Sequence, residues 1–223
     1  MRTKKTKEES LILKNCAKPL LIQDIEKRLE NDDRLGINIG IQEGLILRAL
    51  CTQTNVEKVV EIGTQYGCSA SWMAMGLGKP GQIYTFEQDP ECINNCRLTF
   101  QHPDFQALGC DVTLLEGPAL ERLPEIENVG PFDLIFIDAN KSGYLDYLHW
   151  AKKNVSGDGL IVIDNIYLFG SVFEEECPEK TPKKMWDVMN RVIEEQFSDP
   201  DYHTYIVPTV EGLMVSQKVS TFD

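Results

Sequence analysis

The feature that most constrains the fold of this chain is an alternation of short apolar runs with helical patterns, which extends from Lys58 to the end of the sequence. Runs rich in β-branched and aromatic residues are typical of strands, and each of the first five precedes a helix or turn pattern. These five runs are Lys58–Ile62, Gln82–Phe86, Val112–Leu115, Phe132–Ile137 and Leu160–Ile163. Strands joined by crossover helices lie parallel, so we expect a parallel sheet whose strands are buried on both faces by helices.

The last two strand candidates differ from these in their connection. Only Pro208 to Gly212 separates Tyr202–Val207 from Leu213–Ser216. Because that connection is too short for a crossover helix, the two strands should pair antiparallel. The sequence therefore predicts an α/β fold with a seven-stranded, mostly parallel sheet that ends in an antiparallel hairpin. A polar insertion, Glu174 to Lys184, and an amphipathic helix through Phe197 precede the hairpin.

The residues before the first strand have a helical pattern. Apolar side chains recur at helical spacing from Ser10 to Glu30, with Pro19 dividing the run, and a further helix fits Gln42 to Leu50. With 223 residues, of which 42 % are hydrophobic, the chain can bury one substantial core. We expect a single domain over residues 1–223, with an N-terminal helical cap at 1–55 and the α/β core at 56–218.

Charge and cysteine usage exclude several classes of protein. The 22 basic and 35 acidic residues give a formal charge of -13, which repels polyanions, and only the start, RTKKTK, is basic. The seven cysteines are an odd number without paired C-x-x-C spacing, which favours reduced thiols over a disulfide frame or a zinc site. No signal-like or membrane-spanning apolar run occurs, so we expect a cytoplasmic protein with no membrane partner.

A glycine turn follows the first predicted strand. The strand continues into E-I-G-T-Q-Y-G-C-S, which begins at Glu61 and places Gly63 and Gly67 where a strand turns into a helix. Missing side chains let a ligand approach the backbone there. Glu87 ends the second strand, about 20 residues beyond the turn, where a carboxylate can accept both hydroxyls of a ribose. The turn lacks the G-x-G-x-x-G spacing of a dinucleotide site, so a cationic, phosphate-free nucleoside fits better.

Polar residues also end the fourth and fifth predicted strands. Asp138 follows the fourth strand, and Asp164 and Asn165 follow the fifth, so all three should open onto one crevice. Two carboxylates and an amide oxygen suit Mg²⁺, Mn²⁺ or Ca²⁺ better than Zn²⁺. Such a cation would acidify a bound hydroxyl. Lys141 would then take the proton, if the metal and a partly desolvated pocket lower its pKa.

An aromatic loop comes directly after the Asp-Asn pair. Tyr167 and Phe169 are candidates for covering a planar acceptor, and local packing is the alternative. The acidic run Glu174–Glu179 is either part of a mobile lid or a solvated face. Tyr144 and Trp186 fit the core faces of helices and receive no role. The three histidines are far apart and no nucleophile elbow occurs, so hydrolase chemistry has no support.

These motifs resemble those of the class I S-adenosylmethionine-dependent methyltransferases. In particular, E-I-G-T-x-x-G-x-S, D-x-x-K and D-N resemble the metal-dependent O-methyltransferases of the catechol and caffeoyl-coenzyme A type, from about Gly36 to Lys218. The resemblance implies a Rossmann-like fold, S-adenosylmethionine as methyl donor, a divalent metal with Mg²⁺ foremost, and a homodimer.

The resemblance also implies roles for individual residues. Glu61, Gly63 and Ser69 would contact the methionine part of the cofactor, and Glu87 the ribose. The turn that ends at Ala119 would lie against the adenine. The implied metal ligands are Asp138, Asp164 and Asn165, and the implied catalytic residues are Lys141, as general base, and Asp138, which also borders the cofactor.

The leading hypothesis is an O-methyltransferase that acts on a metal-chelated hydroxyl of a catechol-like or vicinal-diol small molecule. Some relatives methylate a hydroxylated uridine in transfer RNA, so a tRNA 5-hydroxyuridine O-methyltransferase is the alternative; the acidic balance disfavours it and the basic N-terminus leaves it open. A non-catalytic cofactor-binding module is a third class, against which the intact metal motif argues. A nicotinamide dehydrogenase ranks lower because the turn lacks dinucleotide spacing.

Overall fold

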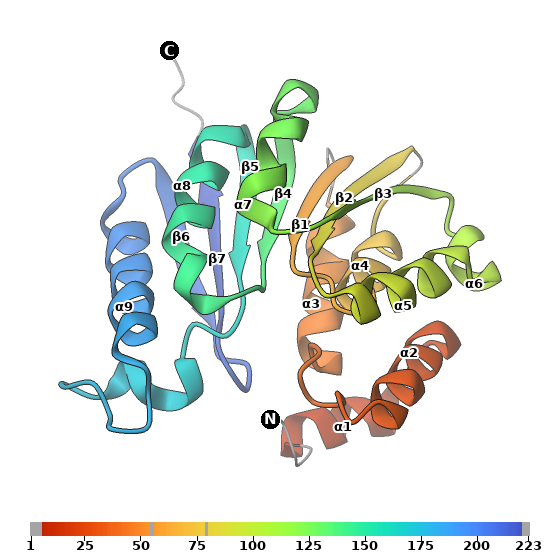
Figure 1. Cartoon of the computed structure of the whole chain (residues 1–223), viewed down its shortest axis with the longest axis horizontal. Coiled ribbons are helices and arrows are strands. Elements are labelled where there is room, and N and C mark those ends of the chain that lie inside the picture. Colours follow the sequence, from red (N-terminus) through yellow and green to blue (C-terminus); the bar gives the residue numbers. More distant parts are fainter. Residues whose placement is uncertain (1–5, 54–55, 79, 220–223) are drawn as a thin grey trace. The chain divides into compact units, whose positions relative to one another are not determined.

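The structure is a computed structural model that describes residues 6–53, 56–78 and 80–219 (Figure 1). Its contacts group the chain into two compact units. Unit 1 comprises Met1–Glu57 and Thr64–Pro118, and unit 2 comprises Lys58–Gly63 and Ala119–Asp223. The single domain expected from length therefore stays a prediction, and each unit is described by itself.

The seven strands follow the order β3-β2-β1-β4-β5-β7-β6. This order, with parallel pairing in its first part and an antiparallel hairpin at its end, confirms the predicted mostly parallel α/β fold. Within the described ranges no helix is long and apolar enough to cross a membrane.

Unit 1 holds the N-terminal helices and two strands. Its helices are α1 (Lys7–Asn15), α2 (Leu20–Asn31), α3 (Ile41–Cys51), α4 (Cys68–Ala74), α5 (Pro90–Gln101) and α6 (Pro103–Gln106), and its strands are β2 (Gly81–Glu87) and β3 (Cys110–Glu116). Pro19 separates α1 from α2, as predicted, because its ring fixes φ at -54° and its nitrogen has no hydrogen to donate. One face of α2 is buried through Leu21, Ile25 and Leu29.

The prediction that every parallel strand is buried on both faces is wrong for β3. Only Leu115 of this strand is buried; Cys110, Val112 and Leu114 are half-buried, and the other three residues are exposed. The reason is its place at the end of the strand order, where β2 is its one neighbour. An edge strand has less cover than a central one, so its burial alternates along the chain.

Unit 2 holds the other five strands, β1 (Lys58–Ile62), β4 (Phe132–Ile137), β5 (Val155–Ile163), β6 (Tyr202–Val207) and β7 (Leu213–Lys218). Its helices are α7 (Ala119–Arg122), α8 (Tyr144–Asn154) and α9 (Lys183–Ser198), with 3₁₀ turns η1 (Leu123–Val129), η2 (Lys141–Gly143) and η3 (Leu168–Phe173). β4 pairs parallel with β1 and β5, and β7 pairs antiparallel with β5 and β6. The β4 residues Leu134 to Ile137 are all fully buried, so this strand lies at the centre of the core.

Candidate functional site

The glycine turn begins with a backbone contact in unit 2 that only glycine allows. Gly63 follows β1 with φ +94°, and a Cβ on it would lie 2.2 Å from the carbonyl oxygen of Asp138. The Asp138 N–H donates to the carbonyl of Ile62 at 3.0 Å. The end of β1 is therefore in direct backbone contact with the end of β4, and Gly63 is necessary for that approach.

The remainder of the turn, in unit 1, contains a buried hydroxyl without a partner. Thr64 is 2 % exposed, and its Oγ1 makes no hydrogen bond to any residue that the structure describes. Gln65 and Gly67 have left-handed φ values of 54° and 82°, which hold the turn open before α4 begins. Ser69, in the first turn of α4, is also buried. An unpaired buried hydroxyl costs about 1–3 kcal/mol, so Thr64 Oγ1 is an atom that a bound ligand can satisfy.

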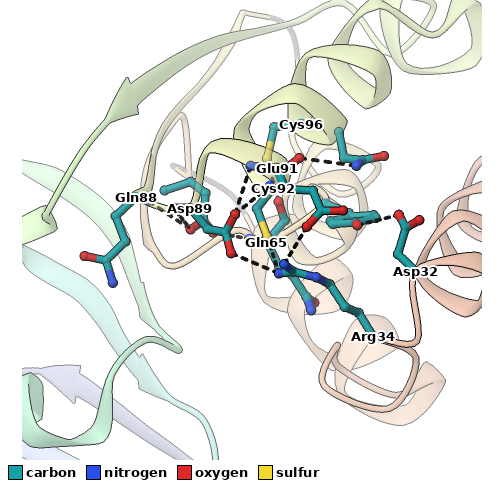
Figure 2. Close-up of polar contacts among 11 residues, drawn as sticks. Asp32, Arg34, Gln65, Gln88, Asp89, Glu91, Cys92 and Cys96 are labelled. Carbon is teal, nitrogen blue, oxygen red and sulfur yellow. Dashed lines mark hydrogen bonds and ion pairs between the residues drawn. The ribbon is translucent and has the colours of Figure 1, made fainter.

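The carboxylate of Glu87 is held in one orientation by main-chain donors. Its Oε2 accepts from the N–H of Gln65 at 2.8 Å, and its Oε1 accepts from the N–H groups of Gln88 at 2.8 Å and Asp89 at 2.9 Å. Three of about four lone-pair positions are thereby filled. Figure 2 labels the three donor residues, Gln65, Gln88 and Asp89. The carboxylate is fixed before any ligand arrives and retains one acceptor position.

The residues predicted to bind a metal converge in unit 2. Asn165 Nδ2 donates to Asp138 Oδ1 at 3.0 Å, and the main-chain N–H of Asn165 donates to Asp164 Oδ1 at 2.8 Å. Asp164 is 1 % exposed, and the N–H of Asp164 donates to the carbonyl of Ile137 at 3.1 Å. Asn165 has a left-handed φ of 62°, a strained conformation that asparagine tolerates. The ends of β4 and β5 thus bring two carboxylates and one amide together.

This donor set fits a hard cation in composition. Within the described residues, no group of three or more His, Cys, Asp or Glu side chains could hold a metal, and the set here has two carboxylates with an amide. Asn165 now presents its amide nitrogen to Asp138. Rotation of this side-chain amide by about 180° exchanges its nitrogen and oxygen with almost no change in shape. The amide oxygen is a ligand that Mg²⁺, Mn²⁺ or Ca²⁺ prefers.

Lys141 lies beside this set as an ion pair. Its Nζ donates to Asp138 Oδ1 at 2.9 Å and to the hydroxyl of Tyr144, and the two charged side chains are 17 % and 19 % exposed. Burial alone would lower the pKa of Lys141, but the charge of Asp138 and the contacts with Tyr144 raise it above its usual value. In the described structure Lys141 is therefore an ammonium, and a general base needs the neutral form.

Tyr144 is the site residue that the sequence interpretation missed. It is fully buried, accepts a hydrogen bond from Lys141, and donates one of 3.1 Å to the main-chain carbonyl of Asp164. The sequence predicts a core face of a helix for Tyr144, which is correct, but the same face borders the ion pair of Lys141 and Asp138. Its position three residues after Lys141, at the spacing that also separates Lys141 from Asp138, was the available signal.

The two aromatic candidates for acceptor binding have different surroundings. Tyr167 is half-buried: its ring lies 4.9 Å from that of Phe173 and against Gly212, where a Cβ would approach it to 2.7 Å. Phe169 is 72 % exposed, and its N–H donates to Glu211 Oε2 at 3.1 Å. Tyr167 therefore packs against the β6–β7 turn, while Phe169 presents its ring to solvent.

The other predicted cofactor residues are divided between the units. Ser69 and Glu87 belong to unit 1, and Glu61, Gly63, Ala119 and Asp138 belong to unit 2. Glu61 is fully buried on β1, where it pairs with Phe136 of β4. Ala119 is half-buried and opens α7.

Known proteins resemble this chain over most of its length. A family model described as O-methyltransferase matches residues 13–219. The catechol O-methyltransferase of Niastella koreensis is 34 % identical over 145 residues, which are 64 % of this chain and 64 % of that protein. The catechol O-methyltransferase of Mycobacterium tuberculosis is 34 % identical over 139 residues, 62 % of this chain and 61 % of that protein. The chain thus spans less than two thirds of the length of these two relatives.

A solved structure shares the fold almost completely. The O-methyltransferase from Bacillus cereus in complex with SAH superposes with a TM-score of 0.84 over 96 % of this chain and 97 % of that one, at 24 % identity. The match of the family model to nearly the whole sequence goes further than this likeness of fold. The chain therefore belongs to the O-methyltransferase family.

Proposed function

We propose that this protein transfers a methyl group from S-adenosylmethionine to a hydroxyl of a catechol-like or vicinal-diol small molecule, with the help of a divalent cation. The observation that carries the proposal is the convergence of Asp138, Asp164 and Asn165 at the ends of β4 and β5, beside Lys141. Family membership supports methyl transfer to oxygen, and the two catechol O-methyltransferases support the acceptor class.

Asp138, Asp164 and Asn165 would hold the cation, with Mg²⁺ foremost and Mn²⁺ or Ca²⁺ as alternatives. When bound, the cation would lower the pKa of a coordinated hydroxyl and fix its direction. Lys141 donates to the carboxylate of Asp138, so the charge of that carboxylate would be shared between Lys141 and a cation that Asp138 held. With less of that negative charge acting on it, Lys141 would have a lower pKa, and its neutral amine, formed by loss of a proton to solvent, would be the form that serves as the proposed base.

The methyl donor would be bound by Glu61, Gly63, Ser69, Glu87 and Ala119. Glu87 supports this assignment because its carboxylate is already oriented and has an acceptor position left for a ribose hydroxyl. The close approach at Gly63 and the unpaired hydroxyl of Thr64 lie in the same turn. Phe169, whose ring is exposed on η3, would contact the acceptor. Tyr167 would support the same turn through the contact of its ring with Phe173.

Methylation of a catechol is the direct test of the proposed function. With S-adenosylmethionine, catechol and Mg²⁺, the protein should form a methyl ether. Removal of the metal by a chelator should lower the rate at least about a hundredfold, because polarisation by a metal is worth several kcal/mol of barrier. Added Mg²⁺ should restore the rate, which mass spectrometry of the product measures. Transfer at full rate after chelation would contradict the metal's role.

The same assay separates the remaining alternatives. Methyl incorporation into bulk tRNA from a strain that lacks this protein, with none into catechols, would show that the acceptor is a transfer RNA nucleoside and not a small molecule. Cofactor binding without transfer to a broad panel of phenols and nucleosides would identify a binding module. A cytoplasmic location and a homodimer stay predictions, and light scattering tests the second.

A Thr64→Val variant tests the cofactor turn. Valine has nearly the shape of threonine without the hydroxyl, so the variant should unfold with a free energy about 1 kcal/mol higher than the wild type, because an unpaired buried group has gone. Its Kd for S-adenosylhomocysteine should rise about three- to tenfold, the net value of one hydrogen bond. Urea denaturation measures the expected gain in stability, and calorimetry measures the expected loss of cofactor affinity.

Thr209→Val is the matched control. Thr209 is 6 % exposed and its Oγ1 also has no partner within the described part of the chain, but it lies in unit 2 beyond β6. This variant should be stabilised in the same way and should bind S-adenosylhomocysteine as the wild type does. Equal cofactor affinity in both variants would remove Thr64 from the proposed site.

A further inference from the structure

A turn at the end of α2 carries two charged side chains, Asp32 and Arg34. α2 ends at Asn31, and Asp33 then takes a left-handed φ of 54°. The chain reverses there, and the N–H of Arg34 donates to the carbonyl of Leu29 at 2.8 Å. The turn fixes the directions of its two flanking side chains, Asp32 and Arg34, which Figure 2 shows pointing toward α5 and the glycine turn.

Arg34 contacts the segment that follows β2. Its Nη1 donates to Asp89 Oδ2 at 3.1 Å, and its Nη2 donates to Glu91 Oε2 at 2.8 Å. Because the planar guanidinium engages two carboxylates at once, it holds this segment in one orientation. Desolvation alone would raise the pKa of the Asp89 carboxyl, but hydrogen bonds from the N–H of Glu91 and from Arg34 lower it below its usual value. Asp89 is thus an anion that Arg34 holds in place.

Asp32 contacts the glycine turn. Its Oδ2 accepts a hydrogen bond of 2.6 Å from the hydroxyl of Tyr66, whose side chain is fully buried. Desolvation and this bond raise the pKa of Tyr66, so the hydroxyl stays a donor at neutral pH. On the other side, Cys96 Sγ donates to the carbonyl of Gln65 at 2.8 Å. The dipeptide Gln65-Tyr66 is therefore held by the turn after α2 on one side and by α5 on the other.

These two stretches are the ones that orient Glu87. One main-chain donor to its carboxylate is Gln65, the neighbour of Tyr66, and another is Asp89, the partner of Arg34. Asp32 acts on the first donor segment and Arg34 on the second. Loss of either contact would let one donor segment move away, and the carboxylate would then lose its fixed direction.

We propose that Asp32 and Arg34 form a clasp, a pair of positioning residues that set the affinity for the nucleoside part of the methyl donor by fixing the carboxylate of Glu87. The clasp touches neither the donor nor the acceptor. It rests on the proposed function, because the role of Glu87 toward a ribose belongs to that proposal. It adds that the helical segment before the α/β core takes part in cofactor recognition.

Calorimetry with S-adenosylhomocysteine tests the clasp in the intact chain. Arg34→Ala should raise the Kd about three- to tenfold. The effect is no larger because both ion pairs of Arg34 are partly exposed to solvent. Arg34→Lys should recover part of this loss, because an ammonium can engage one carboxylate but lacks the fork. Tyr66→Phe keeps the buried ring and removes only the bond to Asp32, and should raise the Kd about threefold. In kinetics, the KM for S-adenosylmethionine should rise while kcat and the acceptor KM stay unchanged.

Lys18→Ala is the matched control for a lost ion pair in the same region. Lys18 Nζ lies 2.6 Å from Glu26 Oε1, with side chains 16 % and 24 % exposed, and the described structure has no hydrogen bond or ion pair from either residue to the clasp or to Glu87. Its Kd should stay within about twofold of the wild type. An equal rise in Lys18→Ala, or an unchanged Kd in both Arg34→Ala and Tyr66→Phe, would overturn the clasp while the proposed function stands. No binding by the wild type would overturn both. If Arg34→Ala does not fold, Tyr66→Phe decides.

Discussion

A Gly63→Ala variant is expected to lose about 3 to 5 kcal/mol of unfolding free energy, and with it all cofactor binding. The added methyl would lie 2.2 Å from the carbonyl oxygen of Asp138, and the residue would have to keep a φ of +94°. Since the obstructing atom belongs to the backbone, a rotamer change cannot relieve the collision. The ends of β1 and β4 would have to separate, which breaks the bond from the N–H of Asp138 to Ile62. Urea denaturation and calorimetry with S-adenosylhomocysteine measure the two losses.

Gly157→Ala is the control for the loss of a glycine in the same unit. Gly157 is an exposed residue of β5, and a Cβ there would meet no heavy atom within 4 Å. Its unfolding free energy should stay within about 0.5 kcal/mol of the wild type. If Gly63→Ala unfolded at the same urea concentration as Gly157→Ala, the approach of β1 to β4 would not be a constraint on this fold.

Asp138→Asn is expected to lower kcat at least about a hundredfold. Removal of a residue that only supports a metal ligand costs about 10- to 100-fold, and Asp138 is proposed to be a ligand itself. Asp138 Oδ1 accepts from Lys141 and from Asn165, so an amide here would weaken both contacts as well as the proposed binding of the cation. Initial rates across a Mg²⁺ titration should show a higher half-saturating concentration as well as the lower kcat.

Asp146→Asn provides the comparison for loss of one carboxylate nearby. Asp146 is an exposed residue of α8, two residues beyond Tyr144. Its rate and its Mg²⁺ dependence should match those of the wild type. Thermal unfolding of both variants separates a lost ligand from a lost fold. A kcat within about threefold of the wild type in Asp138→Asn, at the same Mg²⁺ concentration, would exclude Asp138 as a ligand.

The sequence predicted the strands well where burial is continuous. The bounds of β1 and β4 were obtained from apolar runs alone, and the short connection between β6 and β7 gave their antiparallel pairing. Such runs are informative because a central strand has little tolerance for polar side chains. β3 has the same apolar residues but lies at an edge, and its pattern does not tell which neighbours cover it.

Parts of the candidate site depend on contacts that no local pattern encodes. The placement of Asp138, Asp164 and Asn165 followed from strand ends, which meet in any parallel sheet. In contrast, Arg34 lies 55 residues from Asp89, and Asp32 lies 34 residues from Tyr66, so tertiary structure alone brings each pair together. The lack of a hydrogen-bond partner for the Thr64 hydroxyl within the described residues likewise depends on the side chains and backbone that surround it.

The η3 turn leaves two aromatic rings in water, with Phe169 72 % and Phe173 69 % exposed. An acceptor that covers them would remove apolar surface from water on both partners, which gives association a negative change in heat capacity. Each additional Å² of apolar area removed from water would then favour association by at most about 25 cal/mol, before the costs of ordering the partners. Acceptors with extended ring systems would bind more tightly than catechol itself, although their chelating oxygens are the same. Preference among acceptors would therefore originate in hydration rather than in coordination chemistry.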